Sequence, residues 1–227
     1  AAKRDILRFY PRLAEERVVV IEHGVDREFF AQKFPSERVD ETLSRFDLRA
    51  GGYILYVGAL QPRKNLRTLI AAFESLADDF GDLKLVLAGE VGWLAEGILR
   101  AVATSPFAER IVLTGGLPFE EVVILLQRAT VFAFVPLYEG FGLPILEAFA
   151  AGTPVLTAEN SSLPEVAAEA AEYCRAEEVA SVEAGLRRLL ADENLRNRLV
   201  AAGRKRVGRY DWDRCARRTL AVLHGEL

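Results

Sequence analysis

Two glutamates, Glu139 and Glu147, flank a glycine turn in the segment Glu-Gly-Phe-Gly-Leu-Pro-Ile-Leu-Glu. The apolar run Val131–Val135 before the turn indicates a buried strand, and Pro144 fits the first turn of a helix, where an N–H group would have no partner. The turn at 140–143 is therefore expected at the carboxyl end of a strand and the start of a helix, where ligands of open α/β sheets bind and free N–H groups attract phosphate. We expect both carboxylates to face one small polar ligand, and a sugar nucleotide fits because its neutral hydroxyl groups suit a carboxylate pair.

The spacing of the two glutamates does not by itself exclude an ordinary helix start with acidic residues placed for capping, because 33 of the 227 residues are acidic. The strand, the glycine turn and the proline around the pair favour the ligand site.

A second candidate site follows the first predicted strand, in the segment Gly58-Ala-Leu-Gln-Pro-Arg63-Lys64-Asn65. Two cations at the start of a helix oppose the helix dipole unless an anion lies between them and the helix. We therefore predict that Arg63 and Lys64 bind a diphosphate and neutralise the charge of a leaving group. A solvated basic turn is the alternative.

Glycines also end the next two predicted strands, at Gly89 and at Gly115-Gly116. Glycine lets the backbone approach a planar ring closely, so Gly115 is a candidate for contact with a base and Gly89 a weaker one, with a tight turn as the alternative for each. The segment Ser161-Ser162-Leu-Pro-Glu165 is typical of an ordinary helix start with an N-cap serine.

Short apolar runs alternate with helical patterns from Tyr53 onward, which predicts an α/β fold with a doubly wound, Rossmann-like parallel sheet. The runs are continuously apolar, as expected where helices cover both faces of a sheet. Six strands are predicted, at Tyr53–Gly58, Leu83–Ala88, Arg110–Thr114, Val131–Val135, Pro154–Thr157 and Ala171–Cys174. Apolar stripes at helical spacing follow the first and third strands, and three more helices are predicted after the sixth strand.

The segment before Tyr53 has a different pattern. It predicts a basic helix around Lys3–Phe9, a strand at Arg17–Ile21, a turn at His23 and a polar stretch through Pro35–Asp47. One strand beside a long polar connection cannot build a core. We expect residues 1–30 to be the tail of a preceding domain, 31–50 a linker, 51–209 the nucleotide-sugar-binding domain and 210–227 a C-terminal helix.

Composition narrows the function classes. The net charge of -4 argues against a general nucleic-acid binder, and the basic clusters at 204–206 and 214–218 indicate a solvated helix face, with weak attraction to acidic lipid headgroups as the alternative. No apolar run approaches the roughly 20 residues of a membrane span. Cys174 and Cys215 are far apart and are expected to be free thiols of a reducing compartment, so no metal site is predicted. The sequence holds no methionine, and we expect it to be a fragment or a processed piece.

Two other classes of protein compete with a sugar-nucleotide site. An epimerase or dehydrogenase needs a three-glycine fingerprint after its first strand and a Tyr-x-x-x-Lys pair, and the sequence has neither. Gly58 to Lys64 also lacks the second glycine and the Ser/Thr of a P-loop, so no magnesium ligand is built in. A non-catalytic α/β nucleotide-binding or interaction domain stays open as the alternative.

Taken together, the motifs resemble those of family 4 retaining glycosyltransferases of the GT-B fold, and the mannosyltransferase-type members of polysaccharide assembly most of all. The matching segments are Val57-Gly58-x4-Arg63-Lys64-Asn65, Leu87-Ala88-Gly89, Glu139-Gly140-Phe141-Gly142-Leu143-Pro144-x-Leu146-Glu147-Ala148, Gly152-x-Pro154-Val155 and Ser162-Leu163-Pro164-Glu165-Val166. His23-Gly24-Val25-Asp26 is similar to the turn that ends the family's N-terminal domain, and Tyr210-Asp211-Trp212 to the start of its last helix.

The resemblance implies the donor-binding half of a hexosyltransferase. It places Arg63 and Lys64 on the diphosphate, Glu147 on the ribose and Glu139 on the transferred sugar, and it makes Arg63, Lys64 and Glu139 the candidate catalytic residues. The other implied donor contacts are Gly58, Gly115, Gly140, Phe141, Gly142 and Leu143. It implies no metal or cofactor, a nucleotide-diphosphate sugar as substrate (GDP-mannose favoured, UDP or ADP sugars as alternatives), and retention of configuration.

The resemblance also implies partners and a location. A glycan or lipid-linked acceptor would bind through an N-terminal domain that this sequence lacks, so the fragment alone is expected to be inactive. The full-length enzyme is expected in the cytoplasm, with peripheral contact to the cytoplasmic membrane face as an option. Three positions depart from the family pattern: Ala59 where arginine is frequent, His23 where asparagine is usual, and Gly116 where an aromatic is common.

Overall fold

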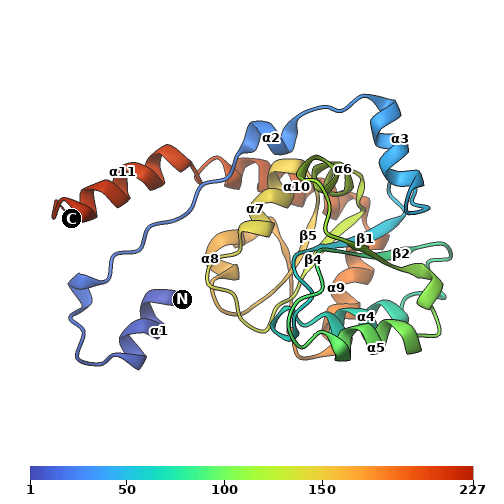
Figure 1. Ribbon diagram of the computed structural model, residues 1–227, viewed down its shortest axis with the longest axis horizontal. Helices are drawn as coiled ribbons and strands as arrows, with labels where there is room; N and C mark the ends of the chain where they lie inside the picture. The colour runs from blue at the N-terminus through green and yellow to red at the C-terminus, as the bar shows by residue number, and fades with distance from the viewer. Residues whose placement is uncertain (227) are drawn as a thin grey trace.

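The computed structural model describes residues 1–226 and is built around one six-stranded parallel sheet (Figure 1). Its strands are β1 (Tyr53–Val57), β2 (Lys84–Ala88), β3 (Ile111–Gly115), β4 (Val131–Phe134), β5 (Val155–Ala158) and β6 (Glu172–Cys174). They lie in the order β3-β2-β1-β4-β5-β6, and each neighbouring pair is parallel. The chain therefore runs outward from β1 to β3 and then returns to place β4 beside β1. The predicted doubly wound sheet and all six of its strands are confirmed.

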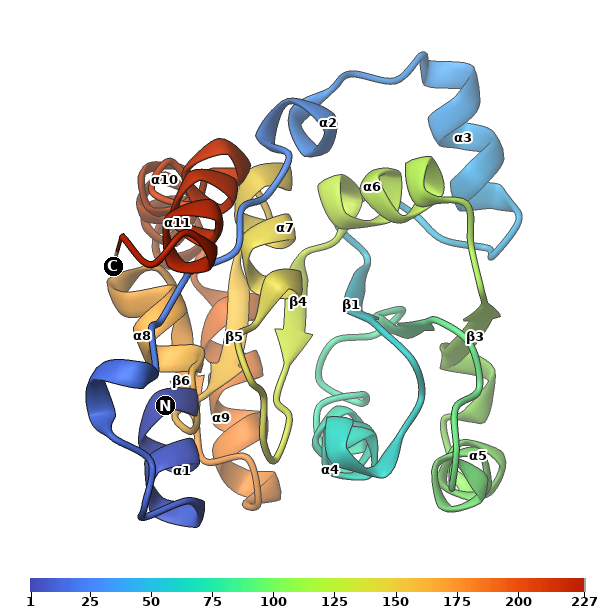
Figure 2. The same cartoon turned by 60° about the vertical axis from the view of Figure 1, so that its left-hand side comes forward.

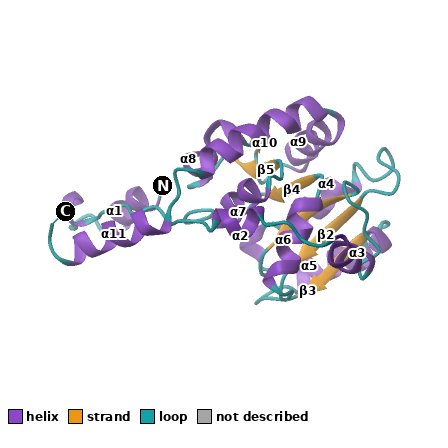
Figure 3. Cartoon of the chain, turned by 90° about the horizontal axis from the view of Figure 1, so that it is seen from above, coloured by secondary structure: helices purple, strands orange, loops and turns teal. Residues whose placement is uncertain are grey.

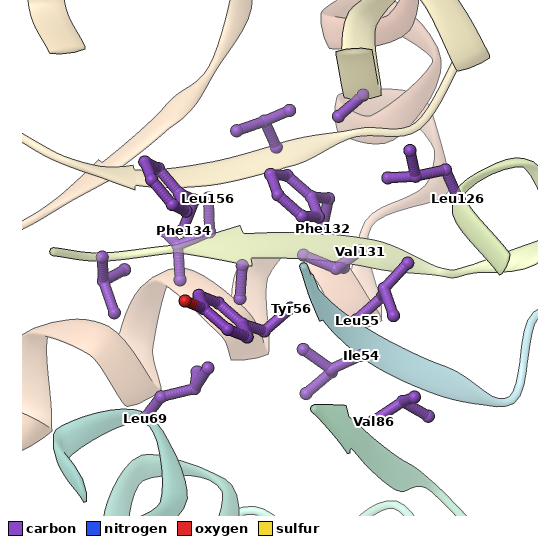
Figure 4. Packing of buried hydrophobic residues seen from close by; sticks show 14 of the residues in the cluster. Ile54, Leu55, Tyr56, Leu69, Val86, Leu126, Val131, Phe132, Phe134 and Leu156 are labelled. Atoms are coloured by element: carbon purple, nitrogen blue, oxygen red, sulfur yellow. The ribbon is translucent and has the colours of Figure 1, made fainter. Parts of the chain in front are cut away.

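The four inner strands of the sheet are mostly apolar because helices cover both of its faces. In β1, β2, β4 and β5 nearly every side chain is buried. Aromatic rings of neighbouring strands stack within this core: the centroids of Tyr56 and Phe134 are 6.3 Å apart, and Figure 4 shows both beside Phe132. Tyr53 satisfies its buried hydroxyl by donating to the carbonyl of Leu125 at 2.7 Å.

The covering helices are α4 (Leu66–Glu74), α5 (Glu96–Thr104), α6 (Phe119–Arg128), α7 (Leu143–Ala151), α8 (Leu163–Ala167), α9 (Val179–Ala191) and α10 (Glu193–Val207). Helix α4 packs against α5 and α9 on one face, while α6 packs against α7 on the other (Figure 2). Helix α10 contacts both α7 and α9 at the β6 side of the sheet. The last helix, α11 (Trp212–Leu223), completes the three helices predicted after β6.

The N-terminal part contains α1 (Ala2–Phe9), α2 (Arg27–Ala31) and α3 (Ser36–Ser44). The predicted strand at Arg17–Ile21 is wrong: residues 15–17 form one turn of 3-10 helix, and residues 18–26 are extended without pairing to any described strand. A strand needs a neighbour for its N–H and C=O groups, and the backbone of Val20, which is 54% exposed, bonds to no other backbone group of residues 1–226. Helices α1 and α11 project from the same side of the sheet, and neither contains a buried residue (Figure 3).

Most of the polar stretch Pro35–Asp47 forms helix α3, which contacts a buried carboxylate on α6. Glu121 accepts hydrogen bonds from Arg38 at 3.1 Å and from Arg45, both of which reach it from the α3 side. Among residues 1–226, no helix is both long enough and apolar enough to cross a bilayer.

Candidate functional site

The basic loop after β1 and the glycine loop after β4 meet at the carboxyl edge of the sheet, as the sequence predicts. Glu139 Oε2 lies 2.6 Å from Lys64 Nζ and 3.1 Å from the Arg63 guanidinium. Arg63 also donates to the carbonyl of Tyr138 at 2.8 Å, and its own carbonyl accepts from the N–H of Leu137 at 3.0 Å. The contact arises because β1 and β4 are neighbours where the strand order reverses, which is where doubly wound sheets bind ligands.

Glu139 is the anion that accompanies the two cations in this structure. Burial opposes its ionisation, but hydrogen bonds and charge from Lys64 and Arg63 outweigh burial, so the pKa of Glu139 is lowered. The carboxylate and the cations therefore form a charged cluster whose ions are already partly withdrawn from water. An incoming diphosphate would compete with Glu139 for the same two cations.

Asn65 fixes the basic loop to the sheet, a role that sequence reasoning missed. Its backbone has φ 60, in the left-handed region that asparagine tolerates better than most residues. Its side-chain amide donates to the carbonyls of Val135 (3.0 Å) and Ala176 (2.7 Å), and its side-chain oxygen accepts from Thr68 at 2.7 Å. An asparagine directly after two cations was the only local signal.

The glycine loop adopts the turn that the sequence predicts and opens α7. Gly142 is the N-cap residue at φ +114, and Pro144 lies in the first helical turn. Within residues 1–226, the N–H groups of Gly140, Phe141 and Gly142 make no hydrogen bond. These donors lie beside the positive end of the helix dipole, so the loop is suited to an anionic ligand.

The serines before α8 bind the glycine loop instead of capping their own helix. Ser162 occupies the N-cap position of α8, but its side chain makes no capping bond, so the prediction of an ordinary N-cap serine is wrong. Its hydroxyl lies 2.8 Å from the carbonyl of Glu139 and 2.7 Å from that of Phe141, while Ser161 Oγ accepts the N–H of Glu139 at 3.1 Å.

Glu147 lies just beyond the first turn of α7, as predicted. Burial raises the pKa of its carboxyl to about 7, and its side chain makes no hydrogen bond or ion pair with any of residues 1–226. A half-buried carboxylate without partners is costly, so it would gain from ligand groups that donate hydrogen bonds.

Gly58 and Gly89, at the ends of β1 and β2, lie where neighbouring atoms leave no room for a side chain. A Cβ on Gly89, whose φ is +150, would lie 2.1 Å from the carbonyl oxygen of Gly58, and one on Gly58 would lie 2.8 Å from the Tyr56 hydroxyl. The N–H of Gly89 donates to the carbonyl of Gly115 at 3.0 Å, which joins the ends of β2 and β3. Gly115 has φ +67, and a Cβ added to it would meet no atom within 4 Å. Contact of Gly115 with a base stays a prediction.

A small aromatic cluster connects the glycine loop to segments at both ends of the chain, and sequence reasoning missed it. The His23 ring meets the Phe141 ring edge-on at 5.0 Å and lies 5.9 Å from Trp212. The Phe141 ring also meets the Tyr210 ring edge-on, with their centroids 5.9 Å apart. A Cβ on Gly24 would lie 2.3 Å from the backbone nitrogen of Trp212, so the two segments cross in direct contact.

Metal ligands are not grouped in the described part of the chain: residues 1–226 hold no cluster of three or more His, Cys, Asp or Glu side chains that could bind a metal ion. Arg63, Lys64 and Glu139 come together at one edge of the sheet, and the glycine loop that carries Glu139 ends at the helix that carries Glu147.

Residues 44–206 match the sequence model of the family described as "Glycosyl transferases group 1". The chain belongs to this family. O-antigen chain mannosyltransferase B of Escherichia coli is 30% identical over 220 residues, which cover 96% of this chain and 57% of that protein. The chain thus spans little more than half the length of this curated relative.

Solved structures agree on the fold, which is that of GT-B glycosyltransferases, as predicted. A glycosyltransferase from Rickettsia africae superposes with a TM-score of 0.86 at 17% identity, over 97% of this chain and 60% of that one. HepE from Anabaena, in complex with UDP and glucose, gives a TM-score of 0.81 at 15% identity, over 93% of this chain and 58% of its own.

Proposed function

We propose that this chain is the donor-binding half of a retaining hexosyltransferase, which transfers a sugar, with mannose favoured, from a nucleotide-diphosphate sugar to a glycan or lipid-linked acceptor. The observation that carries the proposal is the junction of Arg63, Lys64 and Glu139 beside the free N–H groups of the glycine loop. The family membership and the mannosyltransferase relative support the same activity.

The diphosphate would bind between the two loops. Its oxygens would take the hydrogen bonds of Arg63 and Lys64 that Glu139 accepts in this structure, and the N–H groups of Gly140 to Leu143 would contact it from the other side. Glu139 would then turn its carboxylate to hydroxyl groups of the sugar. Because the cations are held in place by Asn65 and by the backbone of the glycine loop, little reorganisation is needed as charge develops.

The ribose hydroxyls would supply the hydrogen-bond donors that Glu147 lacks. Only the ionised carboxylate accepts from both hydroxyls, and the pKa of Glu147 is raised to about 7 by burial. We therefore expect donor affinity to fall as the pH drops below this value, by up to about tenfold for each pH unit.

The reaction would proceed on one face of the sugar. The bond between the anomeric carbon and the diphosphate oxygen breaks, the acceptor oxygen bonds to that carbon from the same side, and the acceptor proton passes to a phosphate oxygen of the departing diphosphate. Arg63 and Lys64 would stabilise the charge on the leaving group, which is the largest electrostatic demand of an oxocarbenium-like transition state.

The acceptor would bind to the part of the enzyme that this sequence lacks. The chain would then bind donor without transferring sugar, and a cytoplasmic location with peripheral membrane contact remains a prediction for the complete enzyme. GDP is the favoured nucleotide, and UDP and ADP are the alternatives that a titration must separate.

Calorimetric titration with GDP, UDP and ADP tests the proposal directly. We expect one nucleotide to bind preferentially, and Lys64→Ala and Glu147→Ala to weaken that binding by about tenfold or more because each removes a charge-assisted contact. Lys205→Ala and Glu109→Ala, at exposed positions away from the two loops, serve as matched controls. If no nucleotide gives heat, the chain is a non-catalytic α/β domain; if both site variants bind as wild type does, the site assignment is wrong.

A further inference from the structure

Ser162 makes contacts that its place in the sequence does not require. The residue is only 3% exposed, and its Oγ, which carries a single proton, lies 2.8 Å from the carbonyl oxygen of Glu139 and 2.7 Å from that of Phe141. A serine at a helix start ordinarily accepts from the helix's own N–H groups, and Ser162 does not. The hydroxyl is therefore committed to a loop more than twenty residues away in sequence.

The two carbonyls that Ser162 holds set the direction of two N–H groups. In a trans peptide the C=O and the following N–H point in opposite directions, and no peptide bond among residues 1–226 is cis. The carbonyl of Glu139 shares a peptide plane with the N–H of Gly140, and the carbonyl of Phe141 shares one with the N–H of Gly142. Holding both oxygens toward Ser162 turns both N–H groups away from it, and neither has a partner within residues 1–226.

Glycine at position 140 leaves its N–H group approachable, whereas Gly142 is buried and a Cβ on it would lie 3.1 Å from Leu163 Cδ2. A Cβ on Gly140 would meet no atom within 4 Å, so the space beside this peptide is open. Gly142 lies at φ +114, which a residue with a side chain adopts only at a cost. Two glycines leave the backbone of this loop many possible conformations, so a contact from outside the loop helps to keep its peptide planes in one orientation.

We propose that Ser162 is a positioning residue for the donor: its hydroxyl orients the N–H groups of Gly140 and Gly142 toward the anionic oxygens of a bound nucleoside diphosphate. The proposal rests on the proposed function of this site. Ser162 itself stays behind the loop, so its effect on binding is exerted entirely through the two peptide planes.

The chain offers a matched control in Thr153, which is 2% exposed and donates from Oγ1 to the carbonyl of Leu126 at 2.6 Å. It precedes β5, whereas Ser162 follows that strand, so it lies at the other end of the sheet. Ser162→Ala and Thr153→Val each remove one buried hydroxyl that donates to a backbone carbonyl. Both are expected to lower stability to a similar degree, but only the first removes a contact with the glycine loop.

Binding of GDP and of inorganic pyrophosphate should be measured for wild type, Ser162→Ala, Ser162→Thr and Thr153→Val. We expect Ser162→Ala to weaken both ligands by about tenfold, Thr153→Val to bind as wild type, and Ser162→Thr, which keeps the hydroxyl, to restore most of the loss. Pyrophosphate is included because its binding does not depend on the base. Equal losses in Ser162→Ala and Thr153→Val, or no loss in either, would overturn the proposal.

A measurement on the wild-type protein keeps the proposal testable if Ser162 variants fail to fold. Pyrophosphate should shift the amide resonances of Gly140 and Gly142 in a proton–nitrogen correlation spectrum. Unchanged glycine amides together with shifts in the Arg63–Lys64 loop would refute the role of Ser162 and leave the proposed function standing. Absence of any binding by GDP, UDP, ADP or pyrophosphate would instead remove both.

Discussion

Replacing Glu147 by glutamine should change the pH dependence of stability, because burial makes the ionised carboxylate costly. The pKa of Glu147 is about 7 against an ordinary 4.5. In this interval the folded chain binds more protons than the unfolded chain, so the free energy of unfolding of the wild type falls as the pH rises through it. Glutamine is neutral throughout and does not incur this loss.

The size of the effect follows from the same two pKa values. They differ by 7 − 4.5, or about 2.5, and each pKa unit corresponds to about 1.4 kcal/mol. The wild type should therefore lose up to about 3 kcal/mol relative to Glu147→Gln between about pH 4 and about pH 8. The value is an upper limit, since the side chain keeps some contact with solvent at the edge of the sheet.

Urea unfolding of wild type and Glu147→Gln across this pH range gives the free energy of unfolding of each. The test is how the difference between these two free energies changes with pH. Glu90→Gln, at an exposed carboxylate, controls for the substitution itself. We expect the curves of wild type and Glu147→Gln to converge at low pH and to separate steadily toward neutral pH. Parallel curves would mean that Glu147 is not buried as described, and the argument for missing hydrogen-bond partners would fail with it.

Two further substitutions test the packing around the site. Gly89→Ala should lower the free energy of unfolding by about 3 kcal/mol or more, because its Cβ would lie 2.1 Å from the carbonyl oxygen of Gly58. Gly81→Ala is the control: its φ is +49 but the space around it is open, so it should cost only about 1 kcal/mol. Thermal unfolding of both variants measures the difference. Glu121→Gln should release α3 from α6, seen as amide exchange in Ser36–Ser44 faster by about tenfold; unchanged exchange would show that apolar contacts alone hold this helix.

Much of the fold could be predicted from the sequence because its strongest signals are local. Continuous apolar runs located every strand of the sheet to within one or two residues, and Gly142 with Pro144 located the start of α7. The meeting of Lys64 with Glu139 could also be predicted, since loops after the strands at a reversal of strand order must share one edge.

What sequence reasoning missed depends on partners that are distant in sequence. Arg17–Ile21 has the composition of a strand but no described strand beside it. The helix of the polar stretch is held by Glu121, 83 positions beyond Arg38. Ser162 matches a capping motif, and only the folded arrangement shows that its hydroxyl binds the carbonyls of the glycine loop instead.

The crossing of Gly24 with Trp212 has a mechanical consequence. A side chain as small as alanine would not fit at Gly24, and the N–H of Val25 reaches the carbonyl of Tyr210 at 3.4 Å, so the two segments cannot slide past each other freely. The segment before the sheet and the segment after it are therefore in contact at this crossing. Because the rings of His23 and Tyr210 both lie against the Phe141 ring, a displacement of either segment should also move the glycine loop.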